Sequence, residues 1–402
     1  MSLGPGPAAP YRVRGGAAAT EVLGAGLIPP RYGEAALSDV LPSVLAGLGV
    51  PAERNALNLG PQRRVCVLLL DGLGWGLLRA HRSQAPFLNQ LADDSSIVLT
   101  AGFPTTTTSS LTSLGVGVPA GEHGMTGYQM RIPGSTRVLN ALQWDGRIDP
   151  REWQPCRTAL QRAETAGIRV TSVAPAEFAG SGLTEAALRG GRYLGVDDPA
   201  ARADAVGQTM RGADPSLTYV YYGDVDRTGH VHGCESPEWR RALSAADAFV
   251  SRLAGGLPPD SLLAATADHG MLDIDRSAVV DVADNPALQV GVELLAGEGR
   301  CRYVHVRPGA ERDVLAIWRE ELGNGFCVLT RDETIATGLL GAVVTTAAAE
   351  RVGDLVVLAR GRGAVFDRRV DSSRVIALVG QHGSLTPAEM LVPLLLHRSG
   401  SG

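Results

Sequence analysis

Six side chains of the types that bind metals occur at widely spaced positions in this chain of 402 residues. They are Asp71, Asp226, His230, Asp268, His269 and His382. Zinc-type cations bind carboxylate oxygen and imidazole nitrogen, and three aspartates with three histidines supply enough ligands for two such ions. The sequence therefore predicts a site for two divalent cations, if the fold brings the six side chains together.

The chain also contains a threonine-rich turn that could supply a nucleophile. Residues 103–113 read Phe-Pro-Thr-Thr-Thr-Thr-Ser-Ser-Leu-Thr-Ser. Ser and Thr are favoured where a helix begins, so a capping role explains this composition equally well. A hydroxyl at a helix N-terminus is also suited to attack phosphorus, because the exposed amides attract an anion and a nearby metal activates the hydroxyl. The residues alone do not select one hydroxyl among Thr105 to Thr108.

Four apolar runs predict the strands that position the candidate ligands. These runs are residues 64–70, 217–222, 262–267 and 374–379, and each leads into an acidic residue or a histidine beside glycine. Side chains at the carboxyl ends of parallel strands converge on one crevice, so residues distant in the sequence can form one site. The first run is too short for a membrane helix and suits a strand buried on both faces. A helix is expected at residues 77–91.

Each ligand candidate also has a structural explanation. An aspartate after a strand, such as Asp71, commonly caps a helix, and the Asp-His pair at 268–269 could form a turn. Asp224 and Asp226 are alternative candidates for one metal-ligand position. The four-residue spacing from Asp226 to His230 favours Asp226, because residues with this spacing in a helical turn can face one point.

The order of these motifs resembles the alkaline phosphatase superfamily and, within it, the type I phosphodiesterase and nucleotide pyrophosphatase family. The matching motifs extend over about residues 60–395 and are Asp71, the Phe-Pro-Thr-Thr-Thr turn that ends at Thr107, Asp-Arg-Thr-Gly-His at 226–230, Asp268-His269, and Gly-Gln-His-Gly with His382. The resemblance implies two zinc ions. One would be held by Asp71, Thr107, Asp268 and His269, and the other by Asp226, His230 and His382. It also implies that Thr107 is the nucleophile.

The expected substrate-binding surface departs from the family pattern at two positions. The family usually places an asparagine shortly after the His-Gly that matches residues 123–124, where it holds a phosphoryl oxygen. Here Tyr128 stands at that position, and its hydroxyl could donate a hydrogen bond instead. The residue after the nucleophile is often an aromatic that contacts a nucleobase, and here it is Thr108. Tyr221 matches the second aromatic of that pair, so the expected substrate contacts are Tyr128, Tyr221 and Thr108.

The composition excludes several classes of partner. The net charge of −5 argues against the basic surface that a nucleic-acid polymer requires. No apolar stretch approaches the length of a membrane helix, and the first ten residues lack the pattern of a signal peptide. The five cysteines have no zinc-finger spacing and suit reduced thiols. We therefore expect a cytoplasmic protein that has no membrane partner and acts on a small-molecule phosphoester; the sequence carries no signal of an oligomeric state.

We expect an α/β fold, with a mainly parallel sheet between helices and a smaller inserted α+β cap. About a hundred residues separate the motifs at 268 and 382 and contain their own strand-like and helical patterns, which predicts the cap. The expected boundaries are residues 19–280 and 370–398 for the catalytic core and 281–369 for the cap. Residues 1–18 and 399–402, rich in small residues, are expected to be flexible.

These observations together predict a hydrolase of phosphate diesters or pyrophosphates in nucleotide-like small molecules. It would act through two zinc ions and a covalent phosphothreonine intermediate. Hydrolysis of phosphomonoesters, phosphonates or sulfate esters at the same site is an alternative, because a scaffold does not determine its substrate. A metal-binding protein without catalytic activity is an alternative of another class, which lack of turnover at full zinc occupancy would favour.

Overall fold

The core of the structure is a seven-stranded, mainly parallel β-sheet. The computed structural model describes residues 11–12, 19–212 and 214–400. The strand order is β3-β19-β9-β2-β8-β6-β7, and among these strands only β19 runs antiparallel to its neighbours. The strands are β2 Arg64–Leu70, β3 Ser96–Thr100, β6 Arg169–Ala174, β7 Arg192–Gly195, β8 Ser216–Tyr222, β9 Ser261–Thr266 and β19 Leu391–Arg398. This is the α/β architecture expected from the sequence.

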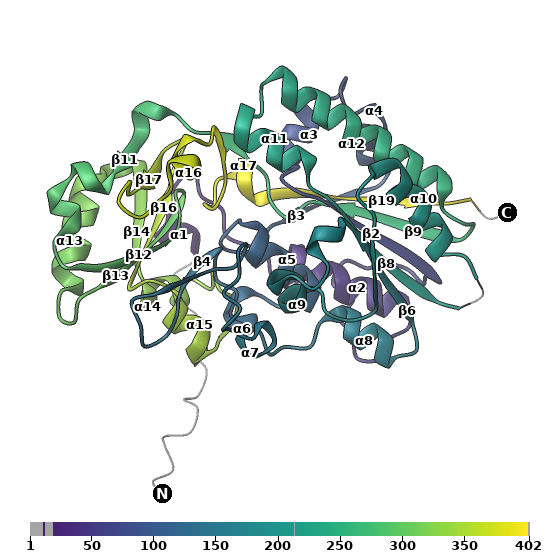
Figure 1. Ribbon diagram of the computed structural model, residues 1–402, viewed down its shortest axis with the longest axis horizontal. Helices are drawn as coiled ribbons and strands as arrows, with labels where there is room; N and C mark the ends of the chain where they lie inside the picture. Colours follow the sequence, from purple (N-terminus) through teal and green to yellow (C-terminus); the bar gives the residue numbers. More distant parts are fainter. Residues whose placement is uncertain (1–10, 13–18, 213, 401–402) are drawn as a thin grey trace, which may run out of the picture.

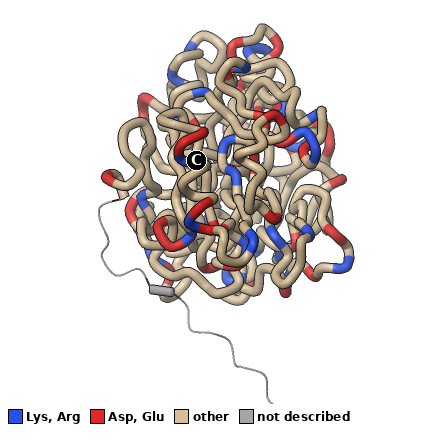
Figure 2. Tube along the Cα trace, turned by 90° about the vertical axis from the view of Figure 1, so that its left-hand side faces the viewer, with Lys and Arg blue, Asp and Glu red and all other residues tan. Residues whose placement is uncertain are grey.

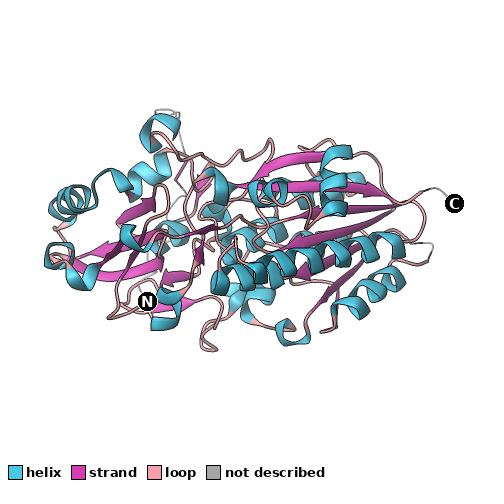
Figure 3. Ribbon diagram, turned by 90° about the horizontal axis from the view of Figure 1, so that it is seen from above, coloured by secondary structure: helices cyan, strands magenta, loops and turns pink. Residues whose placement is uncertain are grey.

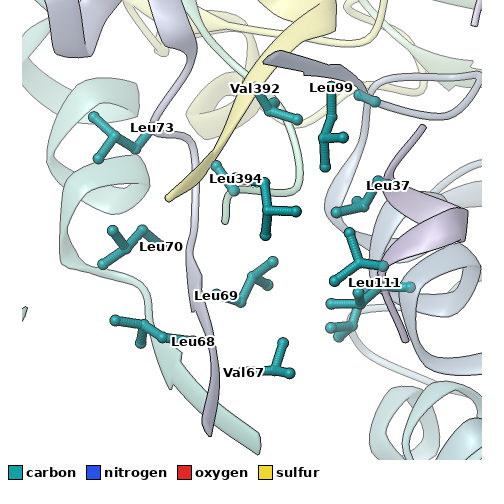
Figure 4. Close-up of a cluster of buried hydrophobic side chains, with 14 of the residues drawn as sticks. Leu37, Val67, Leu68, Leu69, Leu70, Leu73, Leu99, Leu111, Val392 and Leu394 are labelled. Carbon is teal, nitrogen blue, oxygen red and sulfur yellow. The ribbon is translucent and has the colours of Figure 1, made fainter. Parts of the chain in front are cut away.

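Apolar side chains on both faces of β2 explain its central position. Residues 65–70 are all buried. Successive side chains of a strand point to opposite faces. Figure 4 shows Leu68 and Leu70 on one side of the strand and Val67 and Leu69 on the other. The strand is therefore covered on both faces, as strands of parallel sheets usually are.

Helices cover both faces of the sheet, as Figures 1 and 3 show. On one face α12 packs against α4, α10 and α11, and on the other α5 packs against α2, α8 and α9. The bounds are α2 Val40–Gly47, α4 Pro86–Asp94, α5 Thr107–Val116, α8 Ala159–Thr165, α9 Gly182–Ala187, α10 Pro199–Thr209, α11 Asp224–His232 and α12 Pro237–Gly256. Shorter elements outside the central sheet are α1 Ala19–Leu23, α3 Trp75–Ala80, α6 Ala120–His123, α7 Pro150–Trp153, β4 Gln129–Arg131 and β5 Val138–Asn140, and α1 lies beside β14 (Figure 1).

A smaller α+β unit lies on the left of Figure 1, on the side where the parallel strands end. Its antiparallel sheet has the order β12-β13-β16-β14. The bounds are β12 Val292–Glu298, β13 Cys301–Val306, β14 Phe326–Thr330 and β16 Leu355–Ala359, with helices α13 Glu311–Leu322, α14 Arg331–Ala336 and α15 Thr346–Arg351. Trp318 of α13 is completely buried in an apolar cluster formed by this unit. We call residues 292–359 the inserted unit.

The segment before the last ligand candidate differs from the expectation. The apolar run at 374–379 was expected to be a strand, but Ser373–Ala377 forms helix α16. The side chain of Ser372 accepts a hydrogen bond from the backbone N–H of Val375, which caps the helix. Val375 packs against a small apolar cluster instead of a sheet. The strand that follows, β18 Gly380–Gln381, pairs with β10 Leu272–Asp273 outside the central sheet.

The helix expected at residues 77–91 is divided in two. Helix α3 ends at Ala80, and α4 begins at Pro86. Proline lacks an N–H and has its φ angle fixed, so it favours the first turn of a helix and disfavours an interior position. The break therefore follows from Pro86.

The expected flexible termini, 1–18 and 399–402, lie largely outside the described residues. Where they are described, they are held by hydrogen bonds. Strand β1 Tyr11–Arg12 pairs with β15 Val343–Val344, and the backbone N–H of Ser399 donates to the carbonyl of Ser261 at 3.0 Å.

Charged residues of both signs are interspersed over the face in Figure 2, where the inserted unit faces the viewer.

Among the helices of the described residues, none combines the length and the apolar character that crossing a bilayer requires.

A buried ion pair joins the inserted unit to the catalytic sheet. Arg300, in the turn between β12 and β13, donates to both carboxylate oxygens of Glu389 at 2.7 and 2.8 Å. Both side chains are completely buried. Glu389 also accepts hydrogen bonds from Ser384 N at 2.9 Å and from the Thr386 hydroxyl at 2.6 Å. The pair therefore holds the chain segment that follows His382.

Removal of one partner should destabilise the protein strongly. Arg300→Met leaves the Glu389 carboxylate buried without a counter-ion, and breaking a buried pair in this way costs about 3–5 kcal/mol of unfolding free energy. Urea denaturation gives the measurement. The matched control is Arg241→Met, because Arg241 forms an exposed pair with Glu238 at 2.9 Å and should give no measurable shift. Equal urea midpoints for the two variants would show that the Arg300–Glu389 pair does not stabilise the protein.

Candidate active site

Seven polar side chains meet on the side of the sheet where the parallel strands end. Asp71 follows β2, Asp226 and His230 lie on α11 after β8, Asp268 and His269 follow β9, His382 follows β18, and Thr107 begins α5. The rings of His269 and His382 stack with their centroids 3.7 Å apart, which joins two sets of candidate ligands. Strand ends thus bring together residues that lie more than three hundred positions apart in the sequence.

The first ligand set contains Asp71, Asp268 and His269, all of them buried. Nε2 of His269 lies 3.5 Å from Asp71 Oδ1 and 3.4 Å from Asp268 Oδ2. These two oxygens have no hydrogen-bond partner. The other oxygens are occupied, because Asp71 Oδ2 accepts from the Tyr221 hydroxyl at 2.6 Å and Asp268 Oδ1 accepts from Gly72 N at 3.1 Å. Each carboxylate therefore has one oxygen held in place and one directed at His269.

The second ligand set contains Asp226, His230 and His382. Nε2 of His230 lies 3.4 Å from Asp226 Oδ2 and 3.2 Å from Nε2 of His382. Asp226 Oδ1 is buried without a hydrogen-bond partner and lies 3.9 Å from Nε2 of His382. The structure thus groups the protein side chains into the same two sets that the family resemblance implies.

All three histidines present the same ring nitrogen to the site. Nδ1 of His230, His269 and His382 contacts the carbonyl oxygens of Gly380, Gly270 and Thr105 at 2.7, 3.1 and 2.7 Å. A carbonyl only accepts, so each of these contacts places a proton on Nδ1 and directs Nε2 into the site. In a neutral ring Nε2 then carries the lone pair that a cation would bind. Nε2 of His230 and Nε2 of His382 lie 3.2 Å apart.

Burial and like charges shift the pKa values in the site. Burial, together with the charge of Asp268, raises the pKa of Asp71 well above its usual value. Burial also raises the pKa of Asp226 strongly and that of Asp268 to about 6. It lowers the pKa of His269 to about 4 and that of His382 well below its usual value. The neutral form is therefore favoured for the imidazoles of His269 and His382, which lie beside crowded carboxylates.

The spacing of these atoms fits the ligand shell of a divalent cation. Bonds of about 2.0–2.2 Å in a tetrahedral shell place neighbouring ligand atoms about 3.3–3.6 Å apart. In both sets, Nε2 lies 3.4–3.5 Å from carboxylate oxygens. Carboxylate oxygens without partners and imidazole lone pairs are the donors that such a cation binds. The residues present therefore fit a metal centre.

Thr107 is the threonine whose hydroxyl reaches the ligand sets. Its Oγ1 lies 3.1 Å from Nε2 of His269, and the nearby hydroxyl lowers the pKa of Asp71, against the larger effect of burial. Thr106 occupies the N-cap position of α5, but its side chain makes no capping hydrogen bond. The Thr105 hydroxyl instead donates to a backbone carbonyl at 2.7 Å.

Gly72 allows the two ligand sets to approach each other. It has a φ of 74° directly after Asp71, in the region that favours glycine. A Cβ atom at this position would lie 2.9 Å from the Cβ atom of Asp226. A larger residue would therefore separate the end of β2 from α11.

A cleft of about 360 Å³ lies over both ligand sets. Of the three expected substrate contacts, Tyr128 and Tyr221 line this cleft. Tyr221 packs edge-on against Phe178, with ring centroids 5.7 Å apart, although its hydroxyl is occupied by Asp71. Thr108 was also expected here, but its side chain is completely buried and does not line the cleft. As the second residue of α5, it points into the protein.

Several cleft residues were not indicated by the sequence. They are Leu142, Arg227, Val231, Glu298, Gly299, Arg374, Val375, Leu378 and Gln381. Glu298 comes from the inserted unit and stands at the end of a strand without a motif around it. Gln381 could have been identified from the sequence, because it directly precedes His382.

An apolar recess of about 110 Å³ lies beside Thr107. Its apolar and aromatic lining consists of Leu111, Leu142, Ala174, Phe178, Leu183, Leu188, Tyr193, Tyr219 and Tyr221. Leu142 and Phe178 are partly exposed, at 59% and 36%. An organic group attached to a phosphoryl centre at Thr107 could enter this recess.

Sequence comparison supports the interpretation of these motifs. The chain matches the family model described as type I phosphodiesterase / nucleotide pyrophosphatase over residues 65–385. It is 26% identical over 259 residues to human ectonucleotide pyrophosphatase/phosphodiesterase family member 7, covering 60% of this chain and 54% of that protein. The rat protein of the same name is 25% identical over 255 residues, covering 60% and 55%. The chain thus spans about half the length of the curated relatives it matches.

Solved structures share the fold. An inactive variant of murine ectonucleotide pyrophosphatase/phosphodiesterase 5 in complex with AMP superposes with a TM-score of 0.68 at 18% identity, covering 84% of this chain and 88% of that chain. Phosphonoacetate hydrolase from Sinorhizobium meliloti 1021, in complex with phosphonoformate, gives a TM-score of 0.64 at 20% identity, covering 84% and 91%. With the family model matching most of its length, the chain belongs to the type I phosphodiesterase/nucleotide pyrophosphatase family.

Proposed function

We propose that this chain hydrolyses phosphate diesters or pyrophosphates of nucleotide-like small molecules through a phosphothreonine at Thr107. The observation that carries this proposal is the position of Thr107 Oγ1. It lies at the start of a buried helix, 3.1 Å from His269 Nε2, in the cleft that both ligand sets share. The murine relative also supports it, since a variant with threonine replaced by alanine is inactive.

Two divalent cations of the zinc type would be held by the two ligand sets. Asp71, Asp268 and His269 with the Thr107 hydroxyl would hold one, and Asp226, His230 and His382 would hold the other. When bound, such cations lower the pKa of a hydroxyl or water and stabilise charge on phosphoryl oxygens. The backbone carbonyls that fix each histidine keep its Nε2 directed at the site before any cation binds.

The protein side chains account for both halves of the reaction. Thr107 Oγ1 loses its proton and forms the new bond to phosphorus while the bond to the leaving oxygen breaks and that oxygen gains a proton, which gives a phosphothreonine that keeps the other organic group and releases an alcohol or phosphate. Water then attacks the same phosphorus, a proton returns to the Thr107 oxygen, and the phosphomonoester is released. The N-terminus of α5 directs backbone N–H groups towards the anionic group in both steps.

The charges around the cleft favour a singly charged phosphoryl group. Among the described residues that line it, the basic side chains other than histidine are Arg227 and Arg374. Both are exposed, and Arg227 is paired with Asp224 at 2.6 Å. A phosphomonoester dianion would lack a buried basic partner, whereas a diester carries one charge and brings an organic group for the apolar recess.

A substrate panel tests the proposed reaction. Zinc-loaded protein should hydrolyse bis-p-nitrophenyl phosphate faster than p-nitrophenyl phosphate, p-nitrophenyl sulfate or a phosphonate ester. Faster hydrolysis of the monoester, the sulfate ester or the phosphonate ester would mean that the same site acts on that substrate class instead. No turnover of any ester at full zinc occupancy would contradict an enzymatic function.

Thr107→Val should abolish diester hydrolysis while both cations remain bound, because the variant keeps the shape of the side chain and loses the attacking oxygen. The matched control is Thr108→Val, since the Thr108 hydroxyl is buried without a partner and lies outside the cleft. Turnover and zinc content of the two variants give the measurement, and mass spectrometry of acid-quenched wild type should locate on Thr107 the phosphoryl group with its remaining ester group. Activity in Thr107→Val would place the nucleophile elsewhere.

Asp226→Asn should remove one cation and most turnover without unfolding the protein. Metal-free Asp226→Asn should also melt at a higher temperature than the metal-free wild type, because one of three buried, mutually repelling carboxylates is gone. Zinc analysis and thermal melting with and without chelator measure both effects. Asp224→Asn, on the same helix, should keep full zinc content. A lower melting temperature for the metal-free Asp226→Asn variant would show a structural role.

Cation affinity should decrease as the pH falls through about 6. Burial raises the pKa of Asp268 to about 6, so below this pH the carboxyl is protonated and the cation must displace the proton. Calorimetric titration at about pH 7.5 and about pH 5.5, in buffers of different ionisation enthalpy, should show weaker binding and greater proton release at the lower pH. Affinity independent of pH over this interval would contradict the assignment of Asp268 as a ligand.

A further inference from the structure

His382 is the proposed ligand with the least support from the central sheet. Asp71, Asp226 and Asp268 follow β2, β8 and β9, which are seven, seven and six residues long. His382 instead follows β18, which has two residues and pairs with β10 outside the central sheet. The residues before β18 form helix α16 and add no strand to that sheet. Other contacts must therefore hold His382 at the site.

The turn before α5 makes these contacts through Thr105. The Thr105 hydroxyl donates to the carbonyl of Ser384 at 2.7 Å and accepts from the backbone N–H of Gly383 at 2.9 Å. The backbone N–H of Thr105 donates to the Gly383 carbonyl at 3.3 Å. Nδ1 of His382 donates to the Thr105 carbonyl at 2.7 Å. One threonine is thus hydrogen-bonded to three consecutive residues, 382–384.

The Thr105 hydroxyl lies in the protein interior and away from the substrate. Thr105 is completely buried and is not among the described residues that line the cleft. Without its hydroxyl, the N–H of Gly383 and the carbonyl of Ser384 would lose these partners inside the protein. Because unpaired buried polar groups are unfavourable, the segment 382–384 would shift to find new ones.

The same turn carries the proposed nucleophile. Thr107 lies two residues after Thr105 and begins α5, with its Oγ1 atom 3.1 Å from Nε2 of His269. The ring of His269 in turn stacks on the ring of His382, with centroids 3.7 Å apart. A shift of His382 relative to α5 would therefore change the distance between the second ligand set and the attacking hydroxyl.

The contacts of the inserted unit with this segment have a different effect. The Ser384 hydroxyl donates to the carbonyl of Ala359 on β16 at 2.6 Å, and the Ser384 N–H donates to Glu389, the partner of Arg300. These bonds fix residue 384 relative to the inserted unit. The bonds of Thr105 fix residues 382–384 relative to α5, and so relative to the nucleophile.

We propose that Thr105 is a positioning residue whose hydroxyl holds His382, and with it the second cation, in a fixed place relative to Thr107. This inference rests on the proposed function. Outer partners that orient a metal-binding side chain typically change metal affinity by about 10–100-fold when they are replaced. Thr105 acts through the backbone that follows His382 as well as through its ring nitrogen, and it touches neither the cation nor the substrate.

Two variants of Thr105 test the inference by zinc binding. Thr105→Val keeps the shape of the side chain without its hydroxyl, whereas Thr105→Ser keeps the hydroxyl. In calorimetric titration, Thr105→Val should bind one zinc ion with unchanged affinity and the other about tenfold more weakly than the wild type. The weakened ion should be the one that Asp226→Asn loses. Thr105→Ser should restore both affinities to within about threefold of the wild type.

The matched control is Thr112→Val. The Thr112 hydroxyl is also completely buried, and it donates to the Thr108 carbonyl within α5 at 2.7 Å. This variant loses a buried hydrogen bond, but it should keep both zinc affinities. Wild-type affinities in Thr105→Val, or equal losses in Thr105→Val and Thr112→Val, would overturn the inference. If Thr105→Val folds poorly, Thr105→Ala removes the hydroxyl without adding volume and should weaken the same zinc ion.

A double-mutant cycle determines whether Thr105 acts through His382. In a His382→Ala background the clustered hydrogen bonds have no ligand left to position. Adding Thr105→Val there should change the affinity for the weaker zinc ion by less than about threefold, because two residues that act as a unit are not additive. A further loss of about tenfold would show that Thr105 acts by another route, and the inference would be wrong.

Zinc titration also separates this inference from the proposed reaction. If the wild type binds two zinc ions and Thr105→Val weakens one of them, the inference holds even without turnover of any ester, and the proposed reaction alone would be wrong. If the wild type hydrolyses the diester and all variants bind two zinc ions with equal affinity, the inference alone would be wrong. Fewer than two zinc ions in the wild type would contradict both.

Discussion

The arrangement depends on one electrostatic constraint, the confinement of three carboxylates in a small volume. Asp71, Asp226 and Asp268 each keep one buried oxygen without a partner, and burial favours the neutral form of His269 and His382 beside them. Such a site is unfavourable by itself. Hydrogen bonds from the surrounding structure fix these side chains. The Tyr221 hydroxyl donates to Asp71, backbone amides donate to Asp268, and backbone carbonyls accept from the Nδ1 atom of each histidine. Carboxylate oxygens without partners and fixed imidazoles are the ligands that suit a divalent cation.

The inserted unit is part of this arrangement and not an independent cover. Arg300 fixes the segment after His382 through Glu389, and Glu298 from the adjoining strand packs on Gly383 in the same segment. The end of β12 and the turn after it therefore support the segment next to His382, a proposed metal ligand. They also supply the carboxyl group of Glu298 to the cleft. Because the ion pair is bidentate and completely buried, the two units are expected to keep a fixed relative position near the site.

The sequence was most informative where chemistry and strand pattern coincide. Runs of apolar residues before Asp71, Asp226 and Asp268 predicted three central strands, and the ligands were recognisable because each follows such a run beside glycine. The run before His382 has the same composition but forms a helix, since Ser372 caps it and no neighbouring strand is available, a tertiary effect that local pattern does not contain. Thr108 was expected in the cleft from its place in a motif, although the helix turns it inwards. Glu298 could not be predicted, because its proximity to Tyr128 arises from packing between β12 and β4.

The position of β19 in the sheet has a consequence for biosynthesis. Residues 391–398 form the strand that separates β3 from β9, and among the described strands β3 has no other ladder partner. As the chain leaves the ribosome from its N-terminus, residues 96–100 lack this strand partner until residues 391–395 have been synthesised, and unpaired strand edges are prone to aggregation. His382 emerges only shortly before β19. Completion of the sheet and completion of the second ligand set therefore occur close together in the order of synthesis, whereas the first ligand set is already complete at residue 269.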